Sequence, residues 1–279
     1  MRRIGVHTSV AGGLHMALQR AFDLECTTMQ IFSHNPRQWN VRAIADEEII
    51  KFKSLRKKLG IDPVFIHTSY LINLCSANNE VKEKSFQLLK SELDIADQLG
   101  AEYIILHTGT SHGDAETALR DAAMGIKQLS ADHKWHSRIL LENTAGERGD
   151  LTSKISDLDL LITETSSDII GGICLDTCHA YAAGYDLRDA AGLESLISEI
   201  EAAMGIDMLK LIHLNDSKKA VGSGVDRHEH IGEGEIGLTG LGNIVKHPKL
   251  MNAAIVLETP KTTEEDDIKN LKRVRSFSS

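Results

Sequence analysis

Histidine, aspartate and glutamate are concentrated in one stretch of the chain, residues 213 to 237, which directly follows an apolar run. The stretch reads HLNDSKKAVGSGVDRHEHIGEGEIG and contains several residues that can bind a metal: His213, Asp216, Asp226, His228 and His230. Asp226 and His228 are two positions apart, so an extended backbone would direct both side chains to the same side. Imidazole and carboxylate groups gathered between small residues predict a metal site.

The same residue types recur where other short apolar runs end. The runs are 4–6, 29–32, 64–66, 103–106, 139–141, 173–175, 209–212 and 254–257, and they end at His7, Ser33 and His34, His67, His107, Glu142, Asp176, His213 and Glu258. So many metal-binding residue types at equivalent positions would be improbable by chance, and we interpret the set as functional. The isolated His133, His136 and His247 are instead interpreted as structural.

Segments with helical spacing alternate with these runs, for example 79–99, 115–129, 192–204 and 263–274. Gly60 and Gly100 follow the last periodic residue of two helical segments. A strand and a helix repeated in units of roughly 30–40 residues predict an α/β fold, a single-domain (β/α)₈ TIM barrel over residues 1–279. A doubly wound open sheet is the alternative, but no G-x-G-x-x-G follows the first run.

In a barrel, residues at the carboxyl ends of the strands converge on one mouth. Two further clusters, Asp176-Thr-Cys-His179 and Asp226-Arg-His228, add to the strand-end residues. The candidate metal ligands are then His67, His107, Glu142, Asp176, His179, His213, Asp226, His228 and Glu258. This mixture suits zinc or manganese, and it is too large for one ion. Two or three adjacent ions predict hydrolysis of a phosphate ester.

Residues beside the candidate ligands could have a supporting role. Asn143, Thr144, Asn215 and Asp216 are expected either to accept the second N–H of a ligating imidazole or simply to cap turns. His230, although it lies in the same stretch as His228, is interpreted as a neighbour of the site rather than a ligand.

The composition, with 42% hydrophobic and 25% charged residues, is ordinary for a folded soluble protein. The net charge of −9 by itself disfavours nucleic acid as a partner, but divalent ions would concentrate positive charge in one cleft, so a phosphate substrate is not excluded. The cysteines form no C-x-x-C pair and are interpreted as buried thiols. No apolar run approaches the length of a membrane span. We expect a cytoplasmic monomer without a membrane partner.

Three segments resemble the signature segments of the endonuclease IV family of apurinic/apyrimidinic endonucleases. They are LLENTAG (140–146), DTCHAYAAGYD (176–186) and HLNDSKKAVGSGVDRHEHIGEG (213–234), and the likeness extends to IGVHTSVAGGL, NPRQW and HTSYLINL. The resemblance implies a zinc-dependent enzyme with three Zn²⁺ ions, Mn²⁺ being possible at the third site. Its activity would be incision of double-stranded DNA 5′ to an abasic site, leaving a 3′-hydroxyl and a 5′-deoxyribose phosphate, and trimming of blocked 3′ ends.

The resemblance also implies residue roles. His67, His107 and Glu142 would bind the first zinc; Glu142, Asp176, His213 and Glu258 the second; His179, Asp226 and His228 the third. Glu142 and Glu258 would be the catalytic carboxylates, Glu258 orienting the attacking hydroxide. DNA would be contacted by Arg37, Tyr70 and Leu71, which match residues that enter the duplex, and by the loop backbone at Gly222 and Gly224.

Two alternative functions remain open from the sequence. A metal-dependent sugar isomerase or epimerase could use the same kind of barrel with similar strand-end ligands, but it would give no role to His179, Asp226 and His228. A barrel that binds damaged DNA without cutting it would not need the full ligand set.

Overall fold

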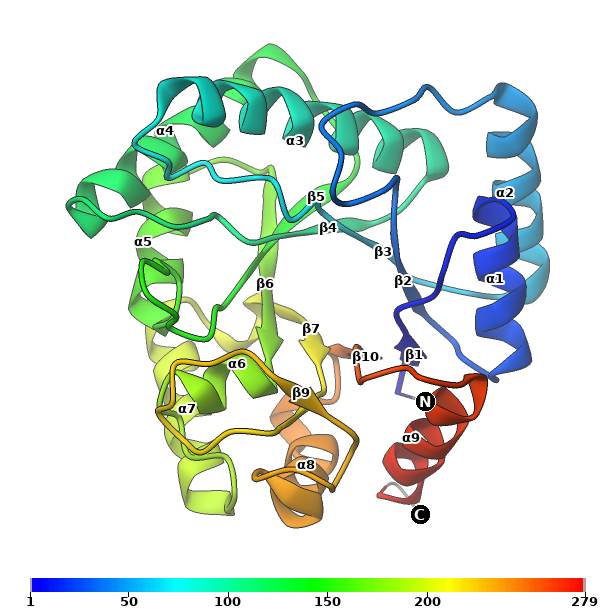
Figure 1. Ribbon diagram of the computed structural model, residues 1–279, viewed down its shortest axis with the longest axis vertical. Coiled ribbons are helices and arrows are strands. Elements are labelled where there is room, and N and C mark those ends of the chain that lie inside the picture. Colours follow the sequence, from blue (N-terminus) through cyan, green and yellow to red (C-terminus); the bar gives the residue numbers. More distant parts are fainter. Residues whose placement is uncertain (1, 278–279) are drawn as a thin grey trace.

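The computed structural model describes residues 2–277, except for the side chains of Asp132 and Glu264. Its centre is a sheet of parallel strands surrounded by helices, with β1 and α9 close together at the lower right (Figure 1). The sheet order is β1-β10-β7-β6-β5-β4-β3-β2, and every pairing in it is parallel. This arrangement confirms the predicted TIM barrel and rules out the open doubly wound sheet, whose strand order would reverse at a switch point.

The barrel strands coincide closely with the predicted apolar runs. They are β1 Ile4–Val6, β2 Met29–Phe32, β3 Val64–His67, β4 Tyr103–Leu106, β5 Arg138–Glu142, β6 Ile170–Asp176, β7 Leu209–His213 and β10 Ala254–Leu257. Several strands are longer than their runs because polar end residues also join the ladder, as in the pairings of Glu142 with Cys174 and Asp176 with His213. Backbone pairing does not depend on an apolar side chain.

One or two helices follow each barrel strand. They are α1 Leu14–Asp23, α2 Asp46–Leu59, α3 Asn79–Leu99, α4 Ala115–Asp132, α5 Ile155–Thr165, α6 Thr177–Ala182, α7 Ala190–Ala203, α8 Gly237–Lys246 and α9 Glu264–Ser276. Segment 79–99 was predicted with its observed bounds, and the other three predicted segments differ at their ends by up to three residues. Gly60 and Gly100 adopt the left-handed conformation that ends α2 and α3, as their positions predicted.

The strand residues alternate between two apolar environments. Residues such as Ile66, Leu141 and Ile212 face the helices and belong to the large outer core. The alternate residues fill the barrel with a small separate layer: Phe65, Ile105, Leu140, Cys174, Leu211, Ala254 and Val256. Because both faces of the sheet are buried, the strands are continuous apolar runs rather than alternating ones.

The barrel closes between β1 and β2 by few interactions. A parallel bridge joins His7 to Gln30, and the Thr8 N–H donates to the Gln30 carbonyl at 2.8 Å. At the other end the Thr27 N–H donates to the Ile4 carbonyl at 3.0 Å. This seam borders the pocket at the mouth of the barrel, because His7, which forms the bridge, also lines that pocket.

The stretch 213–237 is partly ordered as a hairpin, β8 Asp216–Ser217 paired with β9 His228–Glu229. The Asp216 carboxylate accepts backbone N–H groups from Gly232, Gly234, Ile236 and Gly237. One buried side chain thereby joins the end of β7 to the start of α8. The helices described by the structure include none long and apolar enough to cross a membrane.

Candidate metal centre

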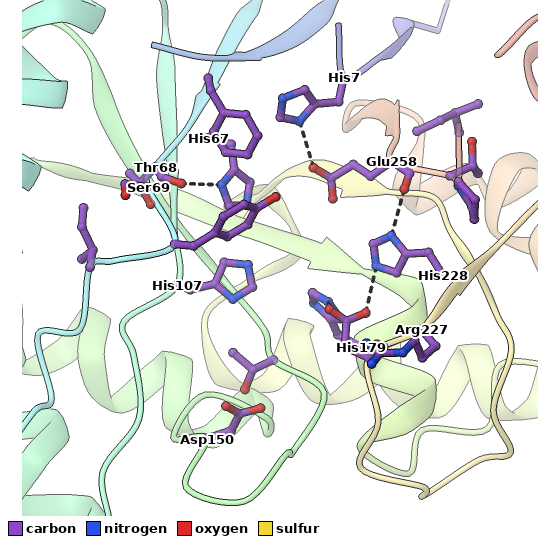
Figure 2. A pocket seen from close by; sticks show the side chains of 18 of the residues that line it. His7, His67, Thr68, Ser69, His107, Asp150, His179, Arg227, His228 and Glu258 are labelled. Atoms are coloured by element: carbon purple, nitrogen blue, oxygen red, sulfur yellow. Dashed lines mark hydrogen bonds and ion pairs between the residues drawn. The ribbon is translucent and has the colours of Figure 1, made fainter. Parts of the chain in front are cut away.

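The predicted ligands converge at the carboxyl ends of the barrel strands, where they form three contiguous groups. The groups are His67, His107 and Glu142; Glu142, Asp176, His213 and Glu258; and His179, Asp226 and His228. Within each group the potential ligand atoms all lie within 4.8 Å of one another. The outer members surround one pocket of about 740 Å³, and Figure 2 shows His67, His107, His179, His228 and Glu258 pointing into it from different elements.

The first group is built on β3, on β5 and just beyond the end of β4. The Glu142 Oε2 atom lies 2.8 Å from His107 Nε2 and 3.4 Å from His67 Nε2. Glu142 is fully buried, yet this oxygen has no hydrogen-bond partner. A buried carboxylate oxygen without a hydrogen bond is costly, and a cation shared with the two imidazoles would satisfy it.

The second group shares Glu142 with the first. Its other oxygen, Oε1, lies 2.8 Å from His213 Nδ1, which is also 3.2 Å from Glu258 Oε2. Asp176 Oδ2 is 4.0 Å from the same nitrogen. Three carboxylates around one imidazole would repel one another strongly without a compensating cation, since all lie in a largely buried site.

The third group joins α6 to the hairpin. Asp226 receives an imidazole on each oxygen, His179 Nε2 at 3.2 Å on Oδ2 and His228 Nε2 at 3.2 Å on Oδ1. His228 Nε2 is also 3.6 Å from Asp176 Oδ2, so the third group adjoins the second. Asp176 itself caps α6, accepting the His179 N–H at 2.8 Å, and this cap turns His179 toward the mouth.

Backbone carbonyls fix the orientation of three imidazoles. The Nδ1 atoms of His67, His179 and His228 lie 2.8, 2.9 and 3.0 Å from the carbonyl oxygens of Thr68, Asn143 and Glu258. A carbonyl can only accept, so each Nδ1 carries a proton and each Nε2 faces the site, where it offers a lone pair in the neutral imidazole that a metal requires. Ligating histidines are characteristically held in this way.

Gln30 is a site residue that the sequence reading missed. Its Oε1 atom lies 2.7 Å from His213 Nε2, and its Nε2 group donates to Glu258 Oε1 at 2.6 Å. Gln30 therefore directs His213 Nδ1 toward Glu142 and restrains Glu258. His7 adds a contact of 3.2 Å from its Nδ1 to the same Glu258 oxygen (Figure 2). Gln30 lies inside an apolar run, and a polar residue in a fully buried strand was the signal available.

Among the predicted supporting residues, Asn143 accepts from a ligating imidazole through its backbone carbonyl, which lies 2.9 Å from His179 Nδ1, and the side chains have other roles. The Asn215 Nδ2 group donates to Asp176 Oδ2 at 2.6 Å, and its Oδ1 accepts the Glu258 N–H at 2.9 Å. The Asn143 side chain bonds the backbone of Asp176. Asp216 anchors the loop, and the Thr144 hydroxyl is buried without a hydrogen-bond partner. The acceptors that orient the imidazoles are backbone carbonyls, which leave no sequence signal.

The electrostatics of the groups favour charged carboxylates. Burial alone would raise the pKa of Glu142, but His107 and His213 outweigh it and hold that pKa well below its usual range. The pKa of Glu258 is likewise lowered despite burial, chiefly by His213. The pKa of His228 rises to about 9, because Asp176 and Asp226 overcome the effect of burial. Carboxylates that stay ionised in a buried cluster suit a site for cations.

Of the residues predicted to contact DNA, Tyr70 lines the pocket. Arg37 is exposed on the loop after β2. The Tyr70 side chain is 65% exposed at the rim, with its ring 5.3 Å from Phe32 and 6.0 Å from His67 between centroids. Leu71 is half-buried and packs against the outer core. Of the predicted pair, Tyr70 is therefore the side chain freely presented to a ligand.

Gly222 and Gly224 lie where the loop docks on α6. Their backbone N–H groups donate to the carbonyls of Tyr181 at 3.0 Å and Ala182 at 2.9 Å, so these amides are used to dock the loop on α6. Both residues have positive φ, which favours glycine. A contact with phosphate at these positions would therefore depend on close approach of the backbone, not on these two amides.

The remaining predictions concern residues away from the centre. All four cysteines are buried and free. His136 contacts Asp97, His247 contacts Glu194, and His133 packs on the Trp135 ring, which agrees with structural roles. His230 Nδ1 lies 3.0 Å from Asn270 Nδ2, and among the described residues it belongs to none of the three groups.

Comparison with known proteins places this geometry in context. Residues 18–276 match the model of a family described as xylose isomerase-like TIM barrel. "Probable endonuclease 4" of Halothermothrix orenii is 41% identical, with 95% of each chain covered, and that of Methanosphaerula palustris is 38% identical over 100% of this chain and 99% of the relative.

Solved structures give the same picture. The crystal structure of endonuclease IV from Thermus thermophilus is 36% identical, covers 99% of this chain and 98% of its own, and superposes with a TM-score of 0.88. A D-tagatose 3-epimerase-like protein has a TM-score of 0.75 at 18% identity, which shows a shared fold alone. From the full-length identity to proteins of that name, the chain belongs to the endonuclease IV family.

Proposed function

We propose that this protein is a DNA repair endonuclease that hydrolyses the phosphodiester bond 5′ to an abasic site. The products would be a 3′-hydroxyl and a 5′-deoxyribose phosphate, and the same centre would trim blocked 3′ ends. The observation that carries the proposal is the third group, His179, Asp226 and His228, directly beside the two groups that share Glu142. A contiguous trinuclear arrangement suits a phosphodiester, whose attacking, leaving and non-bridging oxygens all need charge stabilisation.

We propose that each group holds one Zn²⁺, with Mn²⁺ possible at the third. The fit rests on the donor set, the orphaned Glu142 Oε2 atom and the three imidazoles whose Nε2 atoms point inward. When bound, such ions polarise phosphate oxygens and lower the pKa of water to near neutrality. Glu142 would hold two ions together, since its two oxygens face different groups.

Glu258 is proposed to orient the attacking hydroxide. It sits between the second group and the pocket, and Gln30 and His7 restrain one of its oxygens while the other faces His213. Among the carboxylates of the second group, Asp176 and Glu142 are fully buried, whereas the Glu258 side chain remains 16% exposed. It is therefore the carboxylate of that group best placed to contact both water and substrate.

The damaged duplex would lie across the pocket, with Arg37 and Tyr70 entering it and the abasic sugar turned into the centre. Unstacking costs least where a base is already missing, so such an entry selects for the lesion. Leu71 would support Tyr70 through its packing against the core. The partner is thus double-stranded DNA, bound by one single-domain chain.

A sugar isomerase or epimerase remains the second candidate, because a protein described as D-tagatose 3-epimerase-like shares the fold. It is disfavoured by the third group, which a reaction at one or two metals would leave without a role. A protein that only binds damaged DNA is disfavoured by the complete ligand set.

The decisive experiment combines metal analysis with incision of a duplex that contains one reduced abasic analogue, which cannot undergo β-elimination. The proposal expects about three zinc ions per chain and a single cut 5′ to the lesion. Chelation should abolish the cut, and zinc should restore it. An intact duplex in the presence of bound zinc, or isomerisation of a sugar by the same preparation, would contradict the proposal.

A further inference from the structure

A carboxylate outside the metal centre occupies an unusual position. Glu92 lies on the buried face of α3, among apolar neighbours such as Leu88, Leu89 and Leu93, and is only 1% exposed. Burial of a carboxyl group is costly unless it is hydrogen-bonded, and a leucine would fill this position more favourably for stability. The contacts of Glu92 are therefore informative.

Glu92 contacts both loops that carry the proposed DNA-entering residues. Its two carboxyl oxygens accept the Ser69 N–H, at 3.1 and 3.3 Å, from the loop after β3, residues 68–78. Its Oε1 atom lies 3.3 Å from His34 Nδ1 in the loop after β2, residues 33–45. Ser69 immediately precedes Tyr70, and His34 begins the segment that contains Arg37.

The two loops are also tied to each other above Glu92. The Ser69 hydroxyl donates to the Pro36 carbonyl at 2.7 Å and accepts the Leu71 N–H at 3.2 Å. His34 Nε2 lies 3.2 Å from the Gln38 carbonyl, which closes the second loop around Arg37. A short network of side chains thereby fixes the bases of both loops, while Arg37 and Tyr70 themselves remain exposed.

Burial favours the neutral form of both titratable members of this network. Burial raises the pKa of the Glu92 carboxyl to about 8, although the Ser69 N–H and, more weakly, His67 act to lower that pKa. Burial lowers the pKa of His34. The network consists of hydrogen bonds in a largely buried environment, where the low local dielectric strengthens them.

We propose that Glu92 is a positioning residue that fixes the loops 33–45 and 68–78 in one arrangement before DNA arrives, so that Arg37 and Tyr70 enter the duplex together. This inference rests on the proposed function. Ordering both loops in advance removes an entropic cost that binding would otherwise include. Glu92 belongs to none of the three metal groups among the described residues, so its effect should fall on lesion engagement and not on hydrolysis itself.

The test compares two substrates of the zinc-loaded protein: the duplex with the reduced abasic analogue, and bis(4-nitrophenyl) phosphate, which is too small to need the loops. Glu92→Ala should raise KM for the duplex about tenfold and leave kcat and hydrolysis of the small ester within about twofold. Glu92→Gln retains an oxygen that can accept the Ser69 N–H and should recover most of the KM. Glu83→Ala, on the exposed side of α3, is the matched control.

A fluorescent 2-aminopurine opposite the lesion reports unstacking directly. Its signal on binding should fall in Glu92→Ala and return in Glu92→Gln. Equal loss of both activities together with bound zinc would indicate a merely structural role and overturn the inference, as would an unchanged KM.

Should Glu92→Ala fail to fold, Ser69→Ala removes only the hydroxyl that joins the loops, and an unchanged KM for that variant would equally overturn the inference. The activity of the wild-type protein distinguishes failure of the proposed function from failure of the inference about Glu92. A wild type that leaves the duplex intact contradicts the proposed function, and the inference falls with it. An active wild type with an unaffected Glu92→Ala contradicts the inference alone.

Discussion

Two adjacent layers inside the barrel have opposite chemistry although the same strands build them. The lower layer is apolar and the upper layer holds the candidate ligands, and each pair lies two residues apart on one strand or just past its end: Phe65 and His67, Ile105 and His107, Leu140 and Glu142, Cys174 and Asp176, Leu211 and His213, Val256 and Glu258. Residues two apart on a strand face the same side. The polar centre therefore rests directly on an apolar floor.

The comparison shows how the fold can hold so many charges together. The floor is packed and dry, so it lowers the local dielectric and fixes the strands that carry the ligands. The charges above it then interact strongly with each other and with any bound cation. Stability and chemistry are assigned to different layers, and substitutions in each layer should have different consequences.

The largest expected effect is in the upper layer, at the carboxylate shared by two groups. Glu142→Gln should reduce incision of the abasic duplex by at least about 10³-fold, because it weakens the binding of more than one ion. Zinc content measured by mass spectrometry should fall by more than in Glu258→Gln, since Glu258 belongs to one group only. Both variants should keep a native circular dichroism spectrum. Full zinc occupancy in Glu142→Gln would refute the bridging role.

An intermediate effect is expected in the lower layer. Leu211→Ala should reduce the free energy of unfolding by about 2–5 kcal/mol, because it leaves a cavity beneath His213 in a fully buried layer. Urea denaturation measures this loss. Incision by the folded protein should fall less than about tenfold, since the ligands remain. If Leu211→Ala lost zinc as completely as Glu142→Gln, the two layers would not be separable.

The smallest effect concerns Glu92, the buried carboxylate on the outer side of the strands. Its pKa of about 8 lies above the ordinary value of 4.5, so the folded state keeps a proton that the unfolded state loses in this window. The contribution to stability is complete below pH 4.5 and is lost as the pH rises through 8. As the pH rises from about 5 to 8, the free energy of unfolding should decrease in both proteins. The decrease should be smaller in Glu92→Gln than in wild type, by more than about 1 kcal/mol. Parallel urea-denaturation profiles would contradict this.

The sequence allowed the barrel and the convergence of its strand-end ligands to be anticipated for identifiable reasons, and the division of the ligands into three groups was implied by the resemblance to the endonuclease IV family. Fully buried parallel strands produce apolar runs, and the residue after each run lies at the mouth of the barrel. His107 and Glu142 could therefore be placed at the same mouth from the sequence alone. Helix ends were predictable where glycine adopts a left-handed conformation, as at Gly100. The start of α7 was less predictable, because this helix begins at Ala190, directly after Asp189, which caps it.

What could not be predicted depends on tertiary contacts. Gln30 meets His213 across the barrel, and the distance of 183 residues in sequence hides that pairing. Backbone carbonyls orient the imidazoles, and every residue has a carbonyl, so no residue type signals this role. Asp216 resembled a metal ligand because its carboxylate is the same chemical group as that of the true candidates. In the structure that carboxylate instead accepts hydrogen bonds from four backbone N–H groups.

The small number of backbone hydrogen bonds between β1 and β2 has a consequence for local opening of the barrel. The other strand pairs share longer ladders, so a local opening should begin at the seam, and the amides of Thr8 and Thr27 should exchange with deuterium before those of β5 and β6. Gln30 and His7 border that seam and also restrain Glu258. The part of the barrel that opens most readily thus adjoins the carboxylate proposed to face the substrate.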